Sequence, residues 1–320
     1  MYRIYAAKML RKALILILGV RALAFIDKLK DIVKTGIVAE NEPMSLHCSF
    51  KTGGNADYFV SPGNFVELAE VIKAAKEENI AFTLIGNGSN LLVSDKGIRG
   101  VVIQLGSLMA EIKGENGEYI VDAGALLSAA AAKICEDSYT GFEFASGIPG
   151  SMGGALVMNA GAYGGEMKDV VKWVRVLDEN LEIKTLTNEE MDFGYRRSAA
   201  SEKGYIILQG CVSLEKGDKE EIKRYSAELN GRRRDKQPLN FPSAGSTFKR
   251  PVGHFAGKLI EDANLKGYTL GGAKVSEKHA GFIINYNSAT FLDVINLTEE
   301  VKKIVKEKFN VELELEVEIL

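Results

Sequence analysis

The residues best suited to bind a ligand lie between Gly147 and Gly165, in a stretch that reads GIPGSMGGALVMNAGAYGG. Glycine loses more backbone entropy on folding than other residues, so this density is unfavourable unless the backbone must adopt positive φ or approach a ligand closely. Exposed N–H groups of such a loop can bind a diphosphate. We therefore predict a binding loop here, with tight turns around a buried strand as the alternative.

A serine-nucleophile site is a second possibility, since Ser246 and Lys249 have the S-x-x-K spacing of β-lactamases and penicillin-binding proteins. Lys51-Thr-Gly53 would supply the K-T-G of that set, but the order along the chain is reversed and Ser94-Asp-Lys96 lacks the asparagine. The segment Gly253 to Lys258 is one residue short of a P-loop and lacks its Ser or Thr. Neither of these interpretations is favoured.

The histidines and cysteines do not have the paired spacing of a metal or redox site. We expect no metal, three reduced thiols, and for His279 either a polar contact or a plain surface position. These residues are His47, His254, His279, Cys48, Cys135 and Cys211.

The composition is that of an ordinary globular protein of 320 residues, enough for two or three domains. A net charge of -3 gives no basic footprint for nucleic acid. The one dense basic run, Arg232-Arg-Arg234, is either a solvated helix end or the partner of a single anionic group.

The N-terminus resembles a secretory signal, because basic residues precede an apolar run from Ala13 to Val20. Arg21 lies just before the supposed cleavage site, and the run is too short to span a bilayer. An amphipathic helix and an extension without a role are the alternatives. We favour an extension over residues 1–26 and expect no stable membrane insertion.

A second glycine loop, Gly86-Asn-Gly-Ser-Asn90, is predicted between two strands, Ala81 to Ile85 and Leu91 to Val93. A dinucleotide fingerprint needs a third glycine and a helix directly after the loop, so this is not a Rossmann loop. Before it, Phe65 to Ile80 has the apolar spacing of a helix, and Asn64 with Glu67 resembles a capping box.

The other elements expected up to residue 236 follow from hydrophobic periodicity and turn residues. They are strands at Val101–Leu105, Tyr119–Val121 and Tyr205–Leu214, a hairpin of Val170–Leu177 with Leu181–Leu186, and helices at Leu126–Glu136 and Lys219–Lys236.

The last part of the chain is predicted to be an α+β lobe. After an extended Ser246–Lys249 come a helix at Phe255–Ala263 and a strand at Gly281–Tyr286. Thr290 and Asp293 form a capping box for a helix that ends near Phe309. Val311 to Ile319 alternates strictly, which predicts one strand with Glu312, Glu314, Glu316 and Glu318 equivalent on its polar face.

Five long motifs stand out along this chain, namely IGNGSNLLV, GIPGSMGGALVMNAGAYG, PSAGSTFKRP, FAGKLIEDANLKGY and VSEKHAGFIIN. With them, the sequence from Ser45 onward resembles the UDP-N-acetylenolpyruvoylglucosamine reductases, flavoenzymes of peptidoglycan precursor synthesis. The short link from Lys249 to Phe255 is similar to the compact form of that family, which lacks a tyrosine loop over the substrate.

The resemblance implies an α+β protein with a two-lobed FAD-binding domain of the vanillyl-alcohol-oxidase (PCMH) type and a C-terminal α+β substrate-binding domain. We place the FAD-binding domain at residues 27–217, with lobes of about 27–105 and 106–217, and the substrate-binding domain at 218–320. The terminal strand is expected to return to the active site.

The resemblance also implies that main-chain amides of the two glycine loops bind the FAD diphosphate and that a third segment lines the cofactor. The cofactor-binding residues expected on this basis are Lys51, Thr52, Gly53, Gly54, Gly86, Asn87, Gly88, Ser89, Asn90, Gly147, Pro149, Gly150, Ser151, Gly153, Gly154, Asn159 and Gly161.

The chemistry implied is hydride transfer from NADPH to FAD and then to the enolpyruvyl ether of UDP-N-acetylglucosamine. Ser246 would donate the proton, Arg196 would bind the substrate carboxylate as it becomes an enediolate, and a protonated Glu316 would hydrogen-bond the same oxygen. Lys249, Arg250 and His279 are expected to contact the UDP group. The motif usually written L-E-P-E-V-R reads Leu313-Glu-Leu-Glu-Val-Glu318 here, and Arg250 stands where asparagine is common.

The resemblance implies that the partners are small molecules only, and we expect a monomer. We expect the protein in the cytoplasm, because UDP-sugars and NADPH are cytosolic pools. The resemblance places the protein in cell-wall biogenesis, and through it in cell shape and division. Two other classes remain as alternatives, namely an FAD-dependent oxidase on the same scaffold and a nucleotide-sugar binding module without catalysis.

Overall fold

A computed structural model describes residues 24–320 of the chain, and the apolar run Ala13 to Val20 lies outside the described residues. A helix spans residues 24–32, and Phe25 and Ile26, which the prediction places in the N-terminal extension, are buried in the core. Among the described residues, no helix combines the length and apolar character that crossing a bilayer requires.

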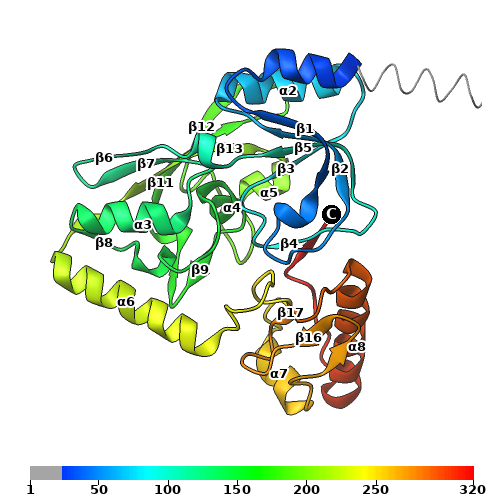
Figure 1. The fold of residues 1–320 in the computed structure, drawn as a ribbon. Coiled ribbons are helices and arrows are strands. Elements are labelled where there is room, and N and C mark those ends of the chain that lie inside the picture. Colours follow the sequence, from blue (N-terminus) through cyan, green and yellow to red (C-terminus); the bar gives the residue numbers. More distant parts are fainter. Residues whose placement is uncertain (1–23) are drawn as a thin grey trace, which may run out of the picture.

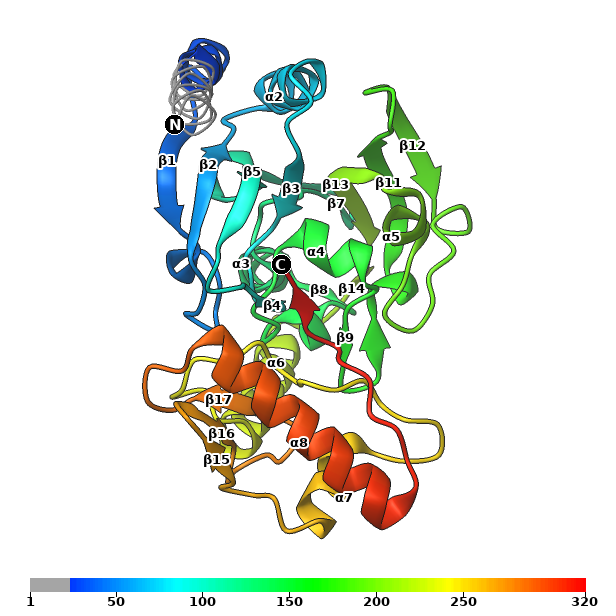
Figure 2. The ribbon, with the colours of Figure 1, turned by 90° about the vertical axis from the view of Figure 1, so that its right-hand side faces the viewer.

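The first sheet (Figure 1) is mixed and has the strand order β1-β2-β5-β3, which Figure 2 shows side by side. β1 is antiparallel to β2, whereas β2 and β3 both pair with β5 in parallel. The helix at 24–32 and α2 cover one face of this sheet, where Leu68 and Ile72 of α2 are fully buried. The bounds are β1 Ile37–Pro43, β2 Asn55–Ser61, β3 Phe82–Ile85, β5 Ile98–Gln104 and α2 Phe65–Glu77.

The start of α2 confirms half of the predicted capping box. The Asn64 side chain accepts hydrogen bonds from the backbone of Val66 and Glu67, as an N-cap does. The Glu67 carboxylate does not return to Asn64 but accepts from N of Gly63 and from N and Oγ1 of Thr35. Glu67 therefore ties α2 to the turn that precedes β1.

The second sheet is antiparallel, with the order β12-β11-β13-β7-β6. The predicted hairpin is confirmed, because β11 pairs with β12 and the Asp178 carboxylate accepts from N of Asn180 and Glu182 in the turn. The bounds are β6 Ile112–Glu115, β7 Glu118–Asp122, β11 Val171–Leu177, β12 Ile183–Thr187 and β13 Ile206–Ser213.

The short helix α4 (Met152–Val157) forms where the turn alternative expected a buried strand, so that alternative was wrong. Met152 and Leu156 are fully buried, and a Cβ on Gly210 of β13 would come within 2.7 Å of both side chains. The helix thus packs closely on the second sheet. The other small elements here are α3 Leu127–Glu136, α5 Ala199–Lys203, β8 Tyr139–Thr140, β9 Gly161–Ala162, β10 Gly165–Glu166 and β14 Glu215–Lys216.

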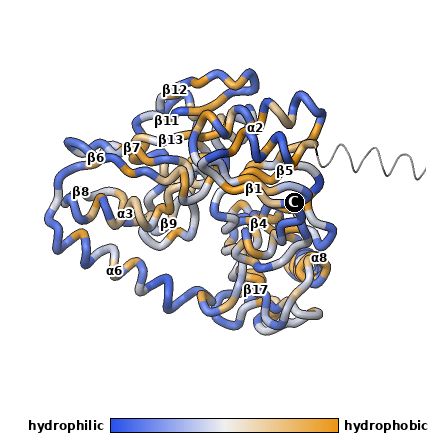
Figure 3. The backbone as a smooth tube through the Cα atoms, turned by 45° about the horizontal axis from the view of Figure 1, so that its top comes forward, coloured by the Kyte–Doolittle hydropathy of each residue, from blue (hydrophilic) through white to orange (hydrophobic). Residues whose placement is uncertain are grey.

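Helix α6 (Lys219–Lys236) has the predicted bounds and packs along α3 and the 3-10 turn Glu143–Ala145. Only Ile222 and Leu229 are buried in it, and Figure 3 shows it as mostly hydrophilic. Beyond it lies a small lobe in which the sheet β15-β16-β17 packs on α8. Its elements are α7 Ala256–Asp262, β15 Thr269–Leu270, β16 Ala273–Val275, β17 Ile283–Asn285 and α8 Phe291–Phe309. The predicted Thr290–Asp293 capping box is present at the start of α8.

The terminal segment runs back from α8 to the first part of the chain, as Figure 2 shows in red. The continuous strand predicted for Val311 to Ile319 was wrong. Leu315 makes an isolated bridge to Phe248, and β18 (Glu318–Ile319) pairs in parallel with β4 (Leu91–Leu92). Leu313 and Val317 are buried, as the alternation predicts. The segment does not belong to a single sheet, because Leu315 and Glu318–Ile319 pair with different parts of the chain.

The first sheet lies between two hydrophobic clusters. Val60 and Ile103 belong to a cluster shared with α2 and the second sheet, while Phe59 and Val102 belong to a cluster shared with the C-terminal lobe. The C-terminal lobe therefore packs directly against the first sheet. The boundary between the FAD-binding domain and the substrate-binding domain, placed between residues 217 and 218, stays a prediction.

Candidate active site

The two glycine loops meet across one cavity. Nδ2 of Asn87 in the first loop donates to O of Pro149 in the second, over 2.7 Å. A Cβ on Gly86 would lie 2.4 Å from Oγ of Ser151, and one on Gly88, whose φ is +63°, would lie 2.0 Å from O of His47. A larger residue at position 86 would displace the Ser151 hydroxyl of the second loop, and one at position 88 would collide with the main chain of His47 and Cys48.

The cavity between the loops has the features that a diphosphate-bearing cofactor needs. Oγ of Ser151 is buried and has no hydrogen-bond partner in the described part of the chain. A Cβ on Gly150 or Gly154 would come no nearer than 3.7 Å to any atom, so their backbones border open space. A hydroxyl donor and bare main chain facing a shared space fit the phosphates of FAD. Apolar side chains on the same cavity, among them Leu84, Leu105 and Ile207, fit an aromatic ring system.

The cavity continues into two others that share lining residues with it. Asn90 and Met158 line both the first cavity and a second one of about 360 Å³. Ser246 and Glu316 line both the second cavity and a third one of about 400 Å³. The glycine loops and the residues predicted to be catalytic therefore line adjoining cavities.

Most of the predicted cofactor residues lie on these cavities, but Lys51–Gly54, Gly147 and Asn159 do not. Gly86 to Asn90, Pro149, Gly150, Ser151, Gly153, Gly154 and Gly161 line the first or the second cavity. The segment Lys51–Gly54 lines none of the three cavities. Gly53 packs on Val93, and a Cβ on Gly54 would meet O of Asp95 at 2.3 Å. Gly147 packs against α6, where a Cβ would lie 2.5 Å from Oδ1 of Asn230.

Asn159 holds the loop that carries Arg196. It is 1 % exposed, and its amide donates to Glu166 and to O of Gly194 while accepting from N of Lys168. The loop from Gly194 to Arg197 closes on itself through a 3.0 Å bond between N of Gly194 and O of Arg197. Arg196 adopts a φ of +55°, which is unfavourable for a residue with a side chain and is held by these contacts.

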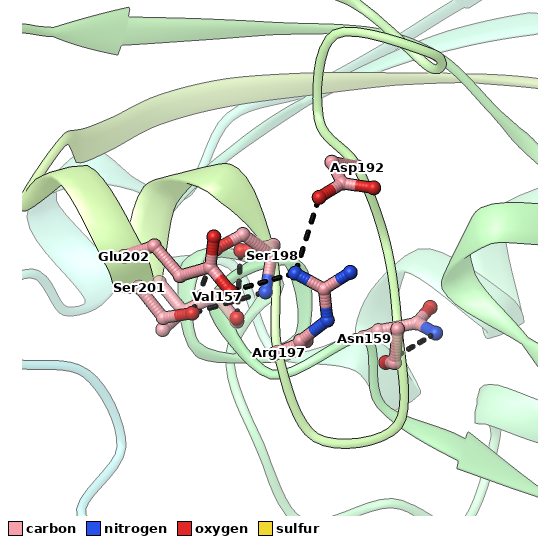
Figure 4. A network of polar contacts seen from close by, with 8 residues as sticks. Val157, Asn159, Asp192, Arg197, Ser198, Ser201 and Glu202 are labelled. Atoms are coloured by element: carbon pink, nitrogen blue, oxygen red, sulfur yellow. Dashed lines mark hydrogen bonds and ion pairs between the residues drawn. The ribbon is translucent and has the colours of Figure 1, made fainter.

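The structure separates the roles of Arg196 and Arg197. Nη1 of Arg197 binds Asp192 and Glu202 at the surface, as Figure 4 shows. Nε of Arg196 instead donates to Oε1 of Glu316 over 2.6 Å. Arg196 thus faces the cavities, and Arg197 stabilises its own loop.

Glu316 differs sharply from its neighbours on the terminal segment, so the expected equivalence of the four glutamates was wrong. Its side chain is 10 % exposed, compared with 75 % for Glu314 and 80 % for Glu312. N of Glu316 donates to O of Thr247, and O of Glu316 accepts from Nδ2 of Asn90. These bonds place Glu316 between the segment of Ser246 and the first glycine loop.

Burial raises the pKa of Glu316, while the nearby Arg196 acts in the opposite direction. Burial lowers the pKa of His279, whose Nδ1 accepts from N of Gly281 over 3.1 Å. The proton of the neutral ring is therefore on Nε2, where it can serve as a donor to a ligand. His279 and Arg250 line the third cavity, whereas Nζ of Lys249 binds Glu314 at 3.2 Å.

Several lining residues were not singled out from the sequence. Ile148, Met158, Tyr205 and Ile207 are apolar or aromatic side chains without a chemical signature. Arg233 lines the second cavity beside Tyr163 and lies in the basic run for which an anionic partner was one interpretation. In residues 24–320 no three His, Cys, Asp or Glu side chains gather as a metal site.

Comparisons with known proteins agree with this architecture. The family model described as "FAD binding domain" matches residues 56–187, and the one described as "UDP-N-acetylenolpyruvoylglucosamine reductase, C-terminal domain" matches residues 237–320. These matches confirm the predicted fold class and identify FAD as the cofactor, so the protein is a flavoprotein. They do not favour the oxidase alternative.

Curated relatives cover nearly the whole chain. The UDP-N-acetylenolpyruvoylglucosamine reductase of Caldanaerobacter subterraneus subsp. tengcongensis is 59 % identical over 92 % of this chain and 97 % of its own length. That of Lachnoclostridium phytofermentans is 53 % identical over 92 % and 96 %. The crystal structure of the Thermus caldophilus enzyme matches with a TM-score of 0.75 and 33 % identity, over 89 % of this chain and 98 % of that one. This protein belongs to the UDP-N-acetylenolpyruvoylglucosamine reductase family, FAD-dependent oxidoreductases of peptidoglycan precursor synthesis.

Proposed function

We propose that the protein uses NADPH to reduce the enolpyruvyl ether of UDP-N-acetylglucosamine to UDP-N-acetylmuramate. The two glycine loops would hold FAD, which would supply hydride transfer from NADPH to the terminal carbon of the enolpyruvyl group. The observation that supports this proposal best is the convergence of Ser246, Arg196 and Glu316 on the two cavities beyond the glycine loops.

Arg196 binds and orients the substrate carboxylate. Its Nε is used by Glu316, which leaves the two terminal nitrogens for a ligand, since no described residue pairs with them. A guanidinium keeps its charge at any working pH and matches a carboxylate with two parallel hydrogen bonds. These bonds strengthen as the carboxylate gains charge on the way to an enediolate.

Glu316 stabilises the same group by donating a hydrogen bond. Only the protonated acid can donate, and burial raises the pKa of Glu316 in this direction. The carboxylate of a bound substrate competes with Glu316 for the Arg196 charge, which favours proton uptake by Glu316 further.

Ser246 donates the proton to the carbon next to the carboxylate. Two backbone hydrogen bonds fix the residue after Ser246: N of Thr247 donates to O of Gly281, and O of Thr247 accepts from N of Glu316. A hydroxyl is a weak acid, so its contribution depends on this fixed position beside the developing charge.

The reaction partners are small molecules, and we infer a cytoplasmic enzyme because UDP-sugars and NADPH are cytosolic. A spectroscopic titration of the FAD-loaded protein tests the proposal. The flavin absorbance should be bleached by NADPH and restored, without oxygen, by UDP-N-acetylglucosamine enolpyruvate. Restoration by oxygen but not by this substrate would favour an oxidase instead.

A further inference from the structure

A chain of polar contacts crosses the first sheet and ends on the first glycine loop. Nε2 of His47 lies 2.8 Å from Oε1 of Glu42 on β1, and Nδ1 of His47 lies 3.1 Å from Oε1 of Gln104 on β5. Nε2 of Gln104 in turn donates to O of Gly86 over 3.1 Å. The His47 ring rests on Phe59 of β2, with 4.1 Å between the ring centroids. We term Glu42, His47 and Gln104 the histidine relay.

The relay fixes the direction of one peptide group in the loop. In a trans peptide the carbonyl oxygen and the following N–H point to opposite sides. Gln104 binds O of Gly86 and lines none of the three cavities, whereas Gly86 and Asn87 line the first one. The N–H of Asn87 therefore points away from Gln104, toward the cavity, and it has no partner among residues 24–320.

The segment that follows His47 holds a second carbonyl of the loop in the same way. N of Ser49 donates to O of Gly88 over 3.1 Å. The N–H of Ser89 belongs to the same peptide group as this carbonyl, so it points away from Ser49. With both carbonyls bound from behind, the loop presents N–H groups to the space predicted for the diphosphate.

The hydrogen bonds of the relay require a doubly protonated ring. O of Gly86 can only accept, so Nε2 of Gln104 faces it and the amide oxygen of Gln104 faces His47. Because this oxygen is an acceptor, Nδ1 of His47 must carry a proton. The Glu42 carboxylate is an acceptor too, so Nε2 of His47 must carry another. A neutral ring has a single proton and can satisfy only one of these neighbours.

The charged group that faces His47 in the described part of the chain is Glu42. β2 contributes an aromatic ring, β5 contributes a neutral amide, and the loop from Gly86 to Asn90, which packs on O of His47, contains no titratable side chain. Asp57 of β2 pairs with Arg99. The side chains of His47 and Glu42 are 17 % and 25 % exposed, so water screens this pair only in part.

We propose that His47 is a positioning residue for FAD and that its proton couples FAD binding to pH. While His47 is charged, the relay holds O of Gly86 and the loop offers its N–H groups to the diphosphate. Loss of the proton sets a lone pair of the ring against Glu42 or Gln104. The Gln104 amide is then free to turn and to release O of Gly86, so FAD binding weakens as the pH rises. Bound FAD in turn favours the charged ring, since the coupling is reciprocal.

This proposal rests on the assignment of the diphosphate to the glycine loops and is independent of the hydride donor and the substrate. The experiment measures the rate of FAD release from the loaded protein, from the fluorescence of the free flavin, at pH values between about 5 and 8, where histidines change charge. The variants are Glu42→Gln and Gln104→Met. His254→Gln is the matched control, because His254 is exposed and lines none of the three cavities.

In the parent protein, FAD release should become ~3–10-fold faster as the pH rises, as expected for the loss of one hydrogen bond. Glu42→Gln should keep the slow rate at every pH, because an amide at this position can accept from a charged ring and donate to a neutral one. Gln104→Met should show the fast rate at every pH, since methionine cannot donate to O of Gly86. His254→Gln should follow the parent protein.

Nitrogen NMR of the histidine rings gives a second readout in the loaded protein. The chain contains only 3 histidines, so comparison with His47→Gln assigns the His47 signals. At the pH of slowest FAD release, both ring nitrogens of His47 should carry protons.

The proposal is overturned if FAD release from the parent protein does not become faster with rising pH, or if the His47 ring is neutral at the pH of slowest release. A pH dependence that persists in Glu42→Gln also overturns it and would point to another group, such as His279. None of these outcomes affects the proposed function, because neither NADPH nor the UDP-sugar is present. A flavin that the enolpyruvyl substrate cannot reoxidise would contradict that function and leave the relay in place.

Discussion

Nε of Arg196 lies 2.6 Å from Oε1 of Glu316, although the two residues are 120 positions apart in the chain. The contact joins the loop after β12 to the segment that returns from α8. The Glu316 side chain is 10 % exposed and that of Arg196 is 26 % exposed, so the pair is largely shielded from water. It stands at the point where the cavity from the glycine loops reaches Ser246.

Glu316→Gln tests the protonation of this pair through the pH dependence of stability. The folded pKa of Glu316 is raised by burial, so the folded protein binds this proton more tightly than the unfolded chain. The free energy of unfolding of the parent protein should therefore rise, relative to Glu316→Gln, as the pH falls from neutrality toward 4.5, the unfolded value. A difference of one unit between the two pKa values corresponds to about 1.4 kcal/mol.

Urea unfolding at several pH values measures this effect. Glu314→Gln is the matched control, since the Glu314 side chain lies on the same segment, is 75 % exposed and makes only a surface pair with Lys249. The same pH trend in both variants would show that the burial of Glu316 has no influence on its protonation.

Arg196→Lys tests the assignment of the substrate carboxylate to one of two adjacent arginines. Lysine cannot form the two parallel hydrogen bonds, so kcat should fall by ~10–100-fold. Arg197→Lys is the control and should change kcat less than about twofold, because Arg197 pairs with Asp192 and Glu202 at the surface. Steady-state kinetics with the enolpyruvyl substrate decide between them, and equal losses in the two variants would refute the assignment.

Gly154→Ala tests the cofactor cavity. Gly154 lies in α4, and a Cβ there would meet nothing nearer than Oγ of Ser151 at 3.7 Å, so the FAD-free protein should gain up to about 1 kcal/mol from helix propensity. The added methyl group projects toward the space proposed for the diphosphate, so FAD affinity should fall at least ~10-fold.

Gly231→Ala in α6 is the control for this prediction. Its Cβ would approach only Nη2 of Arg234, at 3.9 Å, so it should add helix stability without any loss of flavin. Thermal unfolding of the flavin-free proteins and fluorescence titration with FAD supply the two readouts. Full FAD affinity in Gly154→Ala would place the diphosphate elsewhere.

Much of the fold follows from local sequence patterns. Helix α6 and the hairpin β11–β12 appear as predicted because their periodicity and turn residues are unambiguous over long stretches. The strand predicted for Val311 to Ile319 does not form as one element, because partners from two different parts of the chain bind its two ends. Local alternation carries no information about such distant partners.

The site was predicted in part. Glycine density located both loops, since close approach without a Cβ is a property of the residue type. The distinction between Arg196 and Arg197, and the burial of Glu316 beside exposed Glu314, depend on contacts across more than one hundred residues. The sequence pattern made both pairs look equivalent, and only the tertiary structure separates them.

The central claim, that Ser246 supplies the proton, is tested most directly by stopped-flow measurement of both half-reactions in Ser246→Ala. Flavin reduction by NADPH should proceed at the rate of the parent protein, because the hydroxyl takes no part in it. Reoxidation by the enolpyruvyl substrate should slow by at least ~100-fold, the usual contribution of a positioned acid. Reoxidation at the parent rate in Ser246→Ala would contradict the account and assign the proton to another group.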